Sequence, residues 1–153
     1  MIRLYNTLSH KVEEFRPINP PNVSMYTCGP TVYDFMHIGN LRTFMLSDTL
    51  RRVLAFNGYN VTAVENITDI DDKIISRAAE KEISIAALAQ EYTKYFLLDI
   101  DKLNIFPPTR MPRATEHIGK MVKYIEALLE NGLAYQERDG SVYFDISKFP
   151  NYG

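Results

Sequence analysis

The chain has 153 residues, 46% of them hydrophobic, which is enough to bury the core of a compact domain. Its formal net charge of -2 excludes a globally basic nucleic-acid binder, so any contact with RNA has to be local. A single cysteine excludes an internal disulfide, and no apolar run reaches the length of a membrane span or a signal peptide. We therefore expect a cytoplasmic protein without a membrane segment.

The first half of the chain predicts a strand, helix, strand unit. Strands are expected at residues 2–6, 23–28 and 59–67, and residues 11–21 form a polar, proline-containing connection. From residue 38 to residue 56 the apolar positions repeat with helical spacing, until Asn57-Gly58 ends the helix. This unit has the length of a βαβ crossover, which predicts that the strands on either side of the helix are parallel neighbours.

The second half predicts mainly helices. They are expected from about residue 72 to 81, from 85 to 103 and from 118 to 129. Two short strands around Arg138-Asp139-Gly140 indicate a β-hairpin. Two parallel strands are few for this much helix, so the architecture looks unfinished and we expect more chain to follow. Such a piece should expose apolar surface and self-associate.

A polar group opens the first long helix. His37, Gly39 and Asn40 lie where backbone N–H groups and the helix dipole favour a phosphate. Gly39 leaves the backbone open to a ligand, and the side chains of His37 and Asn40 can donate hydrogen bonds to phosphoryl oxygens. From these residues alone, a simple helix cap is the commoner role for this pattern.

Cys28 and Gly29 follow the preceding strand. A lone cysteine usually packs as a small hydrophobic residue, and the alternative is a thiolate ligand for zinc at the end of a parallel strand. Gly29 would leave room for a substrate. Thr68 follows the neighbouring strand, so it either caps the next helix or forms a wall of the same pocket.

The order of these motifs resembles cysteinyl-tRNA synthetases, class I aminoacyl-tRNA synthetases, in their amino-terminal part. The resemblance rests on Tyr-Thr-Cys-Gly-Pro-Thr-Val-Tyr-Asp from Tyr26, His-Ile-Gly-Asn from His37 and Asn-Ile-Thr-Asp-Ile-Asp-Asp-Lys from Asn66. It extends to Leu4–Thr7, to Pro112–Thr115 and to the terminal Asn-Tyr-Gly, and so covers essentially the whole chain.

The resemblance implies an α/β, Rossmann-like (HUP-type) parallel sheet with flanking helices. It also implies that L-cysteine and ATP with Mg²⁺ form cysteinyl-adenylate, and that the acyl group passes to tRNA(Cys). His37, Gly39 and Asn40 would bind ATP, with His37 and Asn40 catalytic. Cys28 would be a zinc ligand, and Gly29 and Thr68 would line the cysteine pocket. The complete enzyme is expected to be a monomer.

The sequence departs from this family where it stops. It contains no Lys-Met-Ser-Lys-Ser signature and none of the family's downstream zinc ligands. We therefore expect residues 1–115 to form the first half of the catalytic domain and residues 116–153 to start a truncated connective insertion that includes the hairpin. By itself this fragment should bind zinc weakly or not at all and have little activity.

Three alternatives remain at this stage. A mycothiol-pathway ligase shares the ancestry and also activates cysteine, but passes it to an amino sugar. A nucleotidylyltransferase has a related motif at the same helix start, although it gives no reason for Cys28 or the acidic cluster. The third alternative is an inactive, stand-alone nucleotide-binding module.

Overall fold

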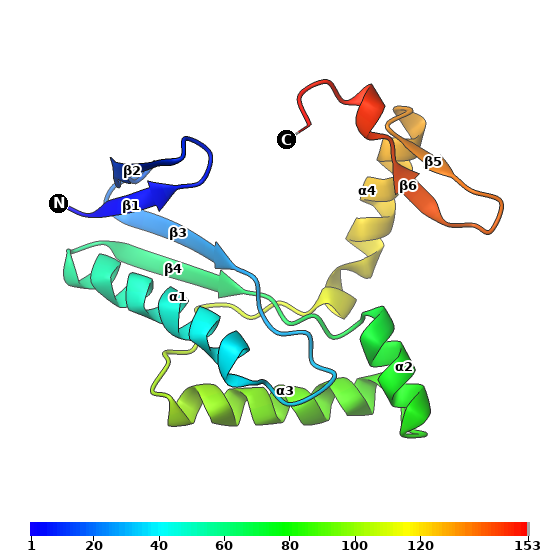
Figure 1. The fold of residues 1–153 in the computed structure, drawn as a ribbon, viewed down its shortest axis with the longest axis horizontal. Coiled ribbons are helices and arrows are strands. Elements are labelled where there is room, and N and C mark those ends of the chain that lie inside the picture. Colours follow the sequence, from blue (N-terminus) through cyan, green and yellow to red (C-terminus); the bar gives the residue numbers. More distant parts are fainter. Residues whose placement is uncertain (153) are drawn as a thin grey trace. The chain divides into compact units, whose positions relative to one another are not determined.

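The structure is a computed structural model that describes residues 1–152 and is drawn in Figure 1. The contacts within the chain divide it into two compact units, Met1–Pro112 and Arg113–Gly153. The first unit contains β1 Arg3–Asn6, β2 Lys11–Glu14, β3 Asn22–Thr27, α1 Ile38–Phe56, β4 Asn60–Glu65, α2 Asp72–Glu80 and α3 Ile85–Lys102. The second contains η1 Ala114–His117, α4 Ile118–Glu130, β5 Ala134–Gln136, β6 Val142–Phe144 and η2 Ile146–Lys148.

The centre of the first unit is the parallel pair β3 and β4, joined by α1. Asn22 lies opposite Asn60, and Thr27 lies opposite Glu65, so both strands end at the same edge. This confirms the predicted βαβ unit. The outer edge of β4 is covered by the segment around Arg110, whose N–H donates to the Ala63 carbonyl at 3.2 Å. The parallel arrangement therefore continues beyond the two strands that the sequence predicted.

The amino-terminal strand was predicted, but its partner was not. Lys11–Glu14 forms β2 and pairs antiparallel with β1, with Arg3 opposite Glu14 and Asn6 opposite Lys11. The prediction of a connection across residues 11–21 was therefore wrong for its first four residues. Lys-Val-Glu-Glu has no apolar alternation, and its side chains are exposed, so backbone pairing with β1 is what makes it a strand.

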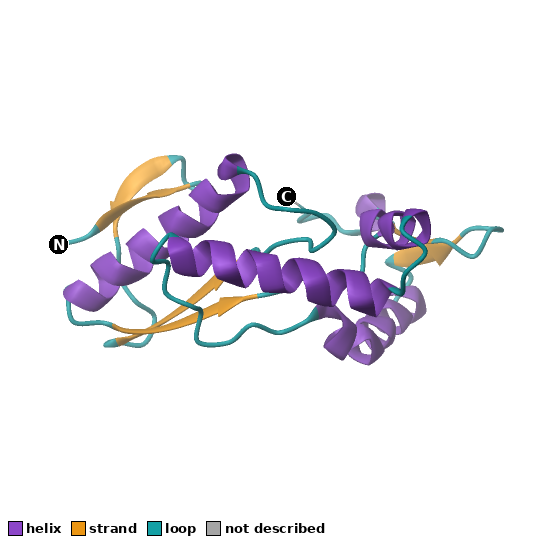
Figure 2. Ribbon diagram, turned by 90° about the horizontal axis from the view of Figure 1, so that it is seen from below, coloured by secondary structure: helices purple, strands orange, loops and turns teal. Residues whose placement is uncertain are grey.

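Helices α1 and α3 enclose the core of the first unit. In Figures 1 and 2, α1 lies along the strand pair and α3 crosses beneath it. Phe44 on α1 meets Phe96 on α3 edge to face, with ring centroids 5.0 Å apart. A second cluster joins the loop after β3 to α2 and α3, and it consists of Val32, Ile67, Ile74, Ala78, Leu88, Ala89 and Tyr92. These two clusters hold the loops that leave β3 and β4.

The helix boundaries follow the expected signals. Helix α1 ends at the predicted Asn57-Gly58, where Gly58 has φ +86, a conformation that glycine adopts without a Cβ penalty. Asp71 caps α2, because its carboxylate accepts the Lys73 N–H at 2.9 Å. Ser84 caps α3 in the same way at Ala87 N.

The second unit contains the short η1, helix α4, a hairpin and the short η2. β5 and β6 pair antiparallel, with Ala134 opposite Phe144, which confirms the predicted hairpin. The Asp145 N–H donates to the Leu133 carbonyl at 2.8 Å and closes the base of this hairpin.

Large apolar side chains are exposed on both units. On α1, Ile38, Leu46 and Phe56 are 82%, 70% and 91% exposed. The expectation of exposed apolar surface is therefore confirmed. Among the described residues, no helix is both long and apolar enough to cross a bilayer.

Candidate functional site

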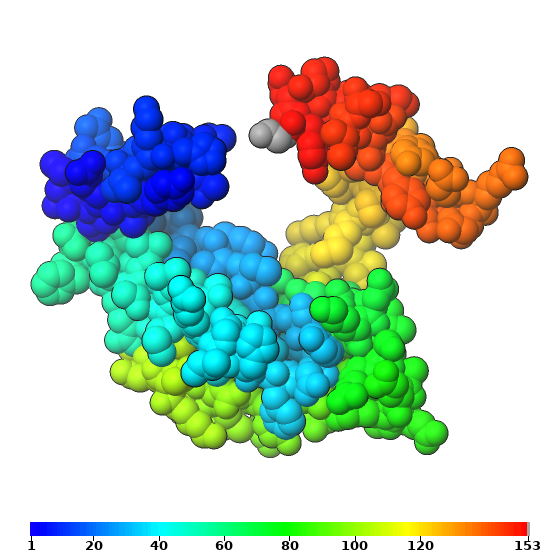
Figure 3. All heavy atoms as spheres, viewed as in Figure 1, coloured from blue at the N-terminus to red at the C-terminus, as the bar shows by residue number. Residues whose placement is uncertain are grey.

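A cavity of about 360 Å³ lies at the edge of the sheet where β3 ends. It is bounded by the loop after β3, the start of α1 and one side chain of α2. In Figure 3 this loop lies on the surface between α1, in cyan, and α2, in green. Four of the predicted site residues line this one cavity: Cys28, Gly29, His37 and Asn40.

The loops that follow β3 and β4 are joined by backbone hydrogen bonds. Thr68 N donates to the Pro30 carbonyl at 2.9 Å, and Val32 N donates to the Thr68 carbonyl at 3.2 Å. Thr68 itself is not among the residues that line the cavity at the end of β3, the main cavity of the site. Its hydroxyl oxygen instead accepts a hydrogen bond from the Asn66 amide at 3.1 Å. Thr68 thus supports the wall that contains Cys28 through its backbone.

Gly29 is the point of closest approach between these two loops. A Cβ added there would lie 1.5 Å from the Asn66 carbonyl oxygen and 3.2 Å from Cγ of Glu65. Real Cβ atoms do not approach a backbone oxygen so closely, so the loops can meet in this way only with glycine at this position. Gly29 therefore fixes how the segment with Cys28 lies on β4.

His37 caps helix α1. Its Nδ1 accepts the Gly39 N–H at 3.0 Å, and its own N–H donates to Asn40 Oδ1 at 3.4 Å, which completes a capping box. Because Nδ1 accepts from a backbone N–H, the neutral ring carries its proton on Nε2. The cap therefore leaves the His37 Nε2–H and the Asn40 amide NH₂ as donors on side chains that line the cavity.

The structure gives Gly39 a steric role, and it does not show the predicted open backbone, because the Gly39 N–H is bonded to His37 and Gly39 does not line the cavity. A Cβ there would lie 2.7 Å from Cε1 of the His37 ring, so a larger residue would push the imidazole out of its capping position. The glycine thus preserves the orientation of His37.

Cys28 is an exposed, free thiol. Its Sγ lies 3.7 Å from the Gly29 carbonyl oxygen, and Cys28 is one of the residues that line the main cavity. It does not pack as a buried hydrophobic residue, and a thiolate is a ligand that zinc prefers. Within residues 1–152 no group of three His, Cys, Asp or Glu side chains is placed to hold a metal ion. Cys28 can therefore offer one ligand, and a complete zinc site would need others.

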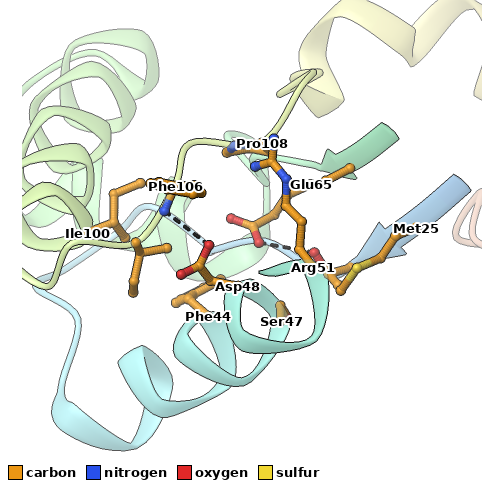
Figure 4. Close-up of a pocket in the computed structure, with 12 residues that line it drawn as sticks. Met25, Phe44, Ser47, Asp48, Arg51, Glu65, Ile100, Phe106 and Pro108 are labelled. Atoms are coloured by element: carbon orange, nitrogen blue, oxygen red, sulfur yellow. Dashed lines mark hydrogen bonds between the residues drawn. The ribbon is translucent and has the colours of Figure 1, made fainter. Parts of the chain in front are cut away.

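A smaller cavity lies behind the strand ends, between β4, α1 and the segment after α3. Figure 4 shows Asp48 and Glu65 pointing toward it. Asp48 accepts from Arg52 Nε at 2.7 Å and from Phe106 N at 3.2 Å, so it ties α1 to the segment after α3. Glu65 is only 7% exposed and accepts from the Thr27 hydroxyl at 3.0 Å. Burial raises the pKa of Glu65. The hydrogen bond from Thr27 lowers this pKa, but its effect is the smaller of the two.

Three residues near the site were not singled out from the sequence. Tyr33 and Lys73 line the main cavity, and the Lys73 ammonium lies 5.4 Å from the centroid of the Tyr33 ring. Asn66 contacts both loops through its side chain. All three lie inside the motifs described above, but a linear motif does not show which of its members meet.

Comparison with known proteins decides the family. Residues 14–153 match the family profile described as the class I (C) tRNA synthetase catalytic domain. The chain belongs to this class I tRNA synthetase family. The cysteine–tRNA ligase of Limosilactobacillus reuteri is 49% identical over the whole chain, and that of Staphylothermus marinus is 48% identical over 99% of it. The chain spans about a third of the length of each, 32% in both cases.

Solved synthetase structures share the fold. The methionyl-tRNA synthetase of Mycobacterium tuberculosis, in complex with methionyl-adenylate, matches 82% of this chain with a TM-score of 0.68 and 19% identity. The match covers 26% of that synthetase. LeuRS of Agrobacterium radiobacter K84, in a ternary complex with tRNA and LeuAMS, matches 81% of this chain and 17% of its own length, with a TM-score of 0.67 and 18% identity. The predicted Rossmann-like α/β fold is thus confirmed.

Substitution of Gly29 by alanine should loosen the edge where the two loops meet. We expect a loss of roughly 1–3 kcal/mol of unfolding free energy, because the Asn66 carbonyl has to move to admit the Cβ. Hydrogen exchange of the β3 and β4 amides measures this loss. Gly119→Ala is the matched control, since nothing lies within 4 Å of the added Cβ, and unchanged protection in Gly29→Ala would contradict the packing account.

Substitution of Glu65 by glutamine should change the pH dependence of stability. The folded state raises the pKa of Glu65 above 4.5, so its stabilising contribution is full below that pH and is lost as the pH rises through the folded pKa. We therefore expect Glu65→Gln to be more stable than the wild type at pH 7, with the difference vanishing below about pH 4.5. Urea unfolding across this range tests it, with exposed Glu91→Gln as the control. If the stability difference between Glu65→Gln and the wild type did not change with pH, it would contradict a raised pKa for Glu65 in the folded state.

Proposed function

We propose that the gene product containing this chain activates L-cysteine with ATP and transfers the cysteinyl group to tRNA(Cys). The observation that carries the proposal is one cavity lined both by the Cys28 thiol and by the cap of helix α1. The names of relatives nearly half identical over the full chain support the substrate. This chain would contribute one side of the active site.

The proposed first step joins an amino acid to a nucleotide. A carboxylate oxygen of cysteine attacks the α-phosphorus of Mg-ATP, the bond to the bridging oxygen breaks, and pyrophosphate leaves with that electron pair. Cysteinyl-adenylate remains and is then attacked by a hydroxyl of the terminal adenosine of tRNA, releasing AMP. The protein forms no covalent bond in this scheme, so its contribution is positioning and charge stabilisation.

The cap of α1 is suited to the nucleotide. The positive end of the helix dipole favours a phosphate, and Gly39 keeps the His37 ring in place. His37 Nε2–H and the Asn40 amide can donate to phosphoryl oxygens as negative charge develops on them. We assign ATP binding and catalysis to His37 and Asn40, and ATP binding to Gly39.

Cys28 is suited to the amino-acid side. We propose that its thiolate is one ligand of a zinc ion and that the remaining ligands come from outside this chain. A zinc ion held there would bind a substrate thiolate far better than the hydroxyl of serine, and so would select cysteine. Gly29 does not leave room for a substrate on the side of its missing Cβ, because the Asn66 carbonyl fills that space; it lets the segment with Cys28 pack against β4. Thr68 supports the same wall through its bonds to Pro30 and Val32.

The rest of the proposal concerns the domains, the cellular location and the oligomeric state of the protein. Residues 1–115 would be the first half of the catalytic domain, and residues 116–153 would begin a connective insertion; the compact units of the structure divide nearby, after Pro112. The role in translation supports a cytoplasmic location. We expect the complete enzyme to act as a monomer. The isolated chain should self-associate, because the exposed apolar side chains of α1 remain in contact with water.

The intact gene product should exchange pyrophosphate into ATP only when L-cysteine is present. His37→Asn should lower kcat by about 10²–10³, because asparagine can still cap α1 but cannot place a donor where Nε2 lies. Cys28→Ser should raise the KM for cysteine. His117→Ala is the matched control and should behave as the wild type, since His117 does not line the cavity.

Two results would contradict the proposed function. One is exchange that proceeds equally without cysteine, and the other is wild-type exchange by His37→Asn. The acceptor is tested separately, by offering tRNA or an amino sugar to the loaded enzyme. Transfer to the amino sugar alone would replace the synthetase assignment with the ligase of the same ancestry.

A further inference from the structure

The Asn66 side chain joins three segments around the candidate cysteine site. Its Oδ1 accepts the Gly29 N–H and the Tyr26 hydroxyl, both at 3.1 Å. Its Nδ2 donates to the Thr68 hydroxyl oxygen at 3.1 Å. Asn66 directly follows β4, whereas Tyr26 and Gly29 lie 40 and 37 residues earlier in the chain. One planar amide therefore ties the end of β3, the turn after it and the loop after β4.

The partners dictate the orientation of this amide. A backbone N–H can only donate, so the Gly29 N–H requires Oδ1 on its side, and Nδ2 must then face Thr68. The Thr68 hydroxyl oxygen accepts that bond, and its own hydrogen can donate elsewhere. Aspartate could keep the bond from Gly29, and the Thr68 hydroxyl could donate to its second carboxylate oxygen, so aspartate could keep both links. Alanine would lose all three bonds, including the one from the Tyr26 hydroxyl.

We propose that Asn66 is a positioning residue for the amino-acid site, an inference that rests on the proposed function. The Gly29 N–H belongs to the same peptide plane as the Cys28 carbonyl, so holding that N–H fixes the backbone that directs the thiol. The Asn66 carbonyl already blocks any Cβ at Gly29, which leaves this turn little freedom to move. Asn66 thus fixes the turn that carries Cys28 relative to Thr68.

A purely structural role predicts a different result. Asn60, at the opposite end of β4, also bonds across the strand pair, because its amide donates to Asn22 Oδ1 at 3.3 Å. It is exposed, and its partner Asn22 does not line the cavity, whereas Gly29, the partner of Asn66, does. If cross-strand amides only stabilise the pair, Asn60→Ala and Asn66→Ala should have the same effects. If Asn66 positions the turn, only Asn66→Ala should affect Cys28.

The experiment compares Asn66→Ala, Asn66→Asp and Asn60→Ala. In the full chain, Asn66→Ala should raise the exchange rate of the Gly29 amide about tenfold, while Asn66→Asp keeps its protection. Asn66→Ala should also change the alkylation rate of Cys28 by iodoacetamide, which reports one site because the chain has one cysteine. In the intact gene product, Asn66→Ala should raise the KM for cysteine about tenfold and leave the KM for ATP within about twofold, and Asn66→Asp should keep the KM for cysteine nearer to that of the wild type. Asn60→Ala should change none of these.

The proposal is overturned if Asn66→Ala leaves Gly29 exchange and Cys28 alkylation at wild-type rates. It is also overturned if Asn66→Ala and Asn60→Ala change them equally, or if the KM for ATP rises as much as that for cysteine. Exchange protection of the other β3 and β4 amides checks that each variant folds. If no variant and no wild type shows cysteine-dependent activity, the proposed function fails, and the Gly29 and Cys28 measurements still decide whether Asn66 holds the turn.

Discussion

The approach of Gly29 to the carbonyl of Asn66 is the constraint on which the candidate site depends. Parallel pairing ends β3 and β4 at one edge, with Thr27 opposite Glu65. The loops that follow stay side by side, and they can approach each other so closely only because Gly29 has no side chain. The hydrogen bonds between Thr68 and the backbone of Pro30 and Val32 continue the parallel pairing beyond this contact. Cys28 is exposed at the cavity because the contacts of Gly29 with Asn66 fix the turn that carries the thiol.

The other side of the cavity shows that a structural and a functional role can belong to the same residue. His37 and Asn40 form the capping box of α1, as the simpler interpretation of the sequence suggested. That box uses Nδ1 of the histidine and Oδ1 of the asparagine, which are acceptors. It leaves the donors of both side chains for an anion. Capping thus orients the groups that would bind a phosphate, and Gly39 preserves that orientation.

The sequence predicted what depends on local patterns. The long apolar repeats marked α1 and α3, Asn57-Gly58 marked the end of a helix, and the βαβ spacing predicted parallel strands. It did not predict β2, whose Lys-Val-Glu-Glu has no alternation and is a strand only through its pairing with β1. Nor did it single out Asn66, because the bonds of its amide reach residues about 40 positions away. The assignments of Cys28, His37 and Thr68 came from the family resemblance, and they remain proposals.

The most direct test is a crystal structure of the intact gene product with a sulfamoyl analogue of cysteinyl-adenylate. The account predicts that the sulfamoyl group, which replaces the phosphate, lies within hydrogen-bond distance of His37 Nε2 and the Asn40 amide. It also predicts that the cysteinyl end lies beside Cys28 and Gly29, with the Asn66 amide still bonded to Gly29 and Thr68. An analogue bound away from this cavity, or bound with its cysteinyl end remote from Cys28, would contradict the account.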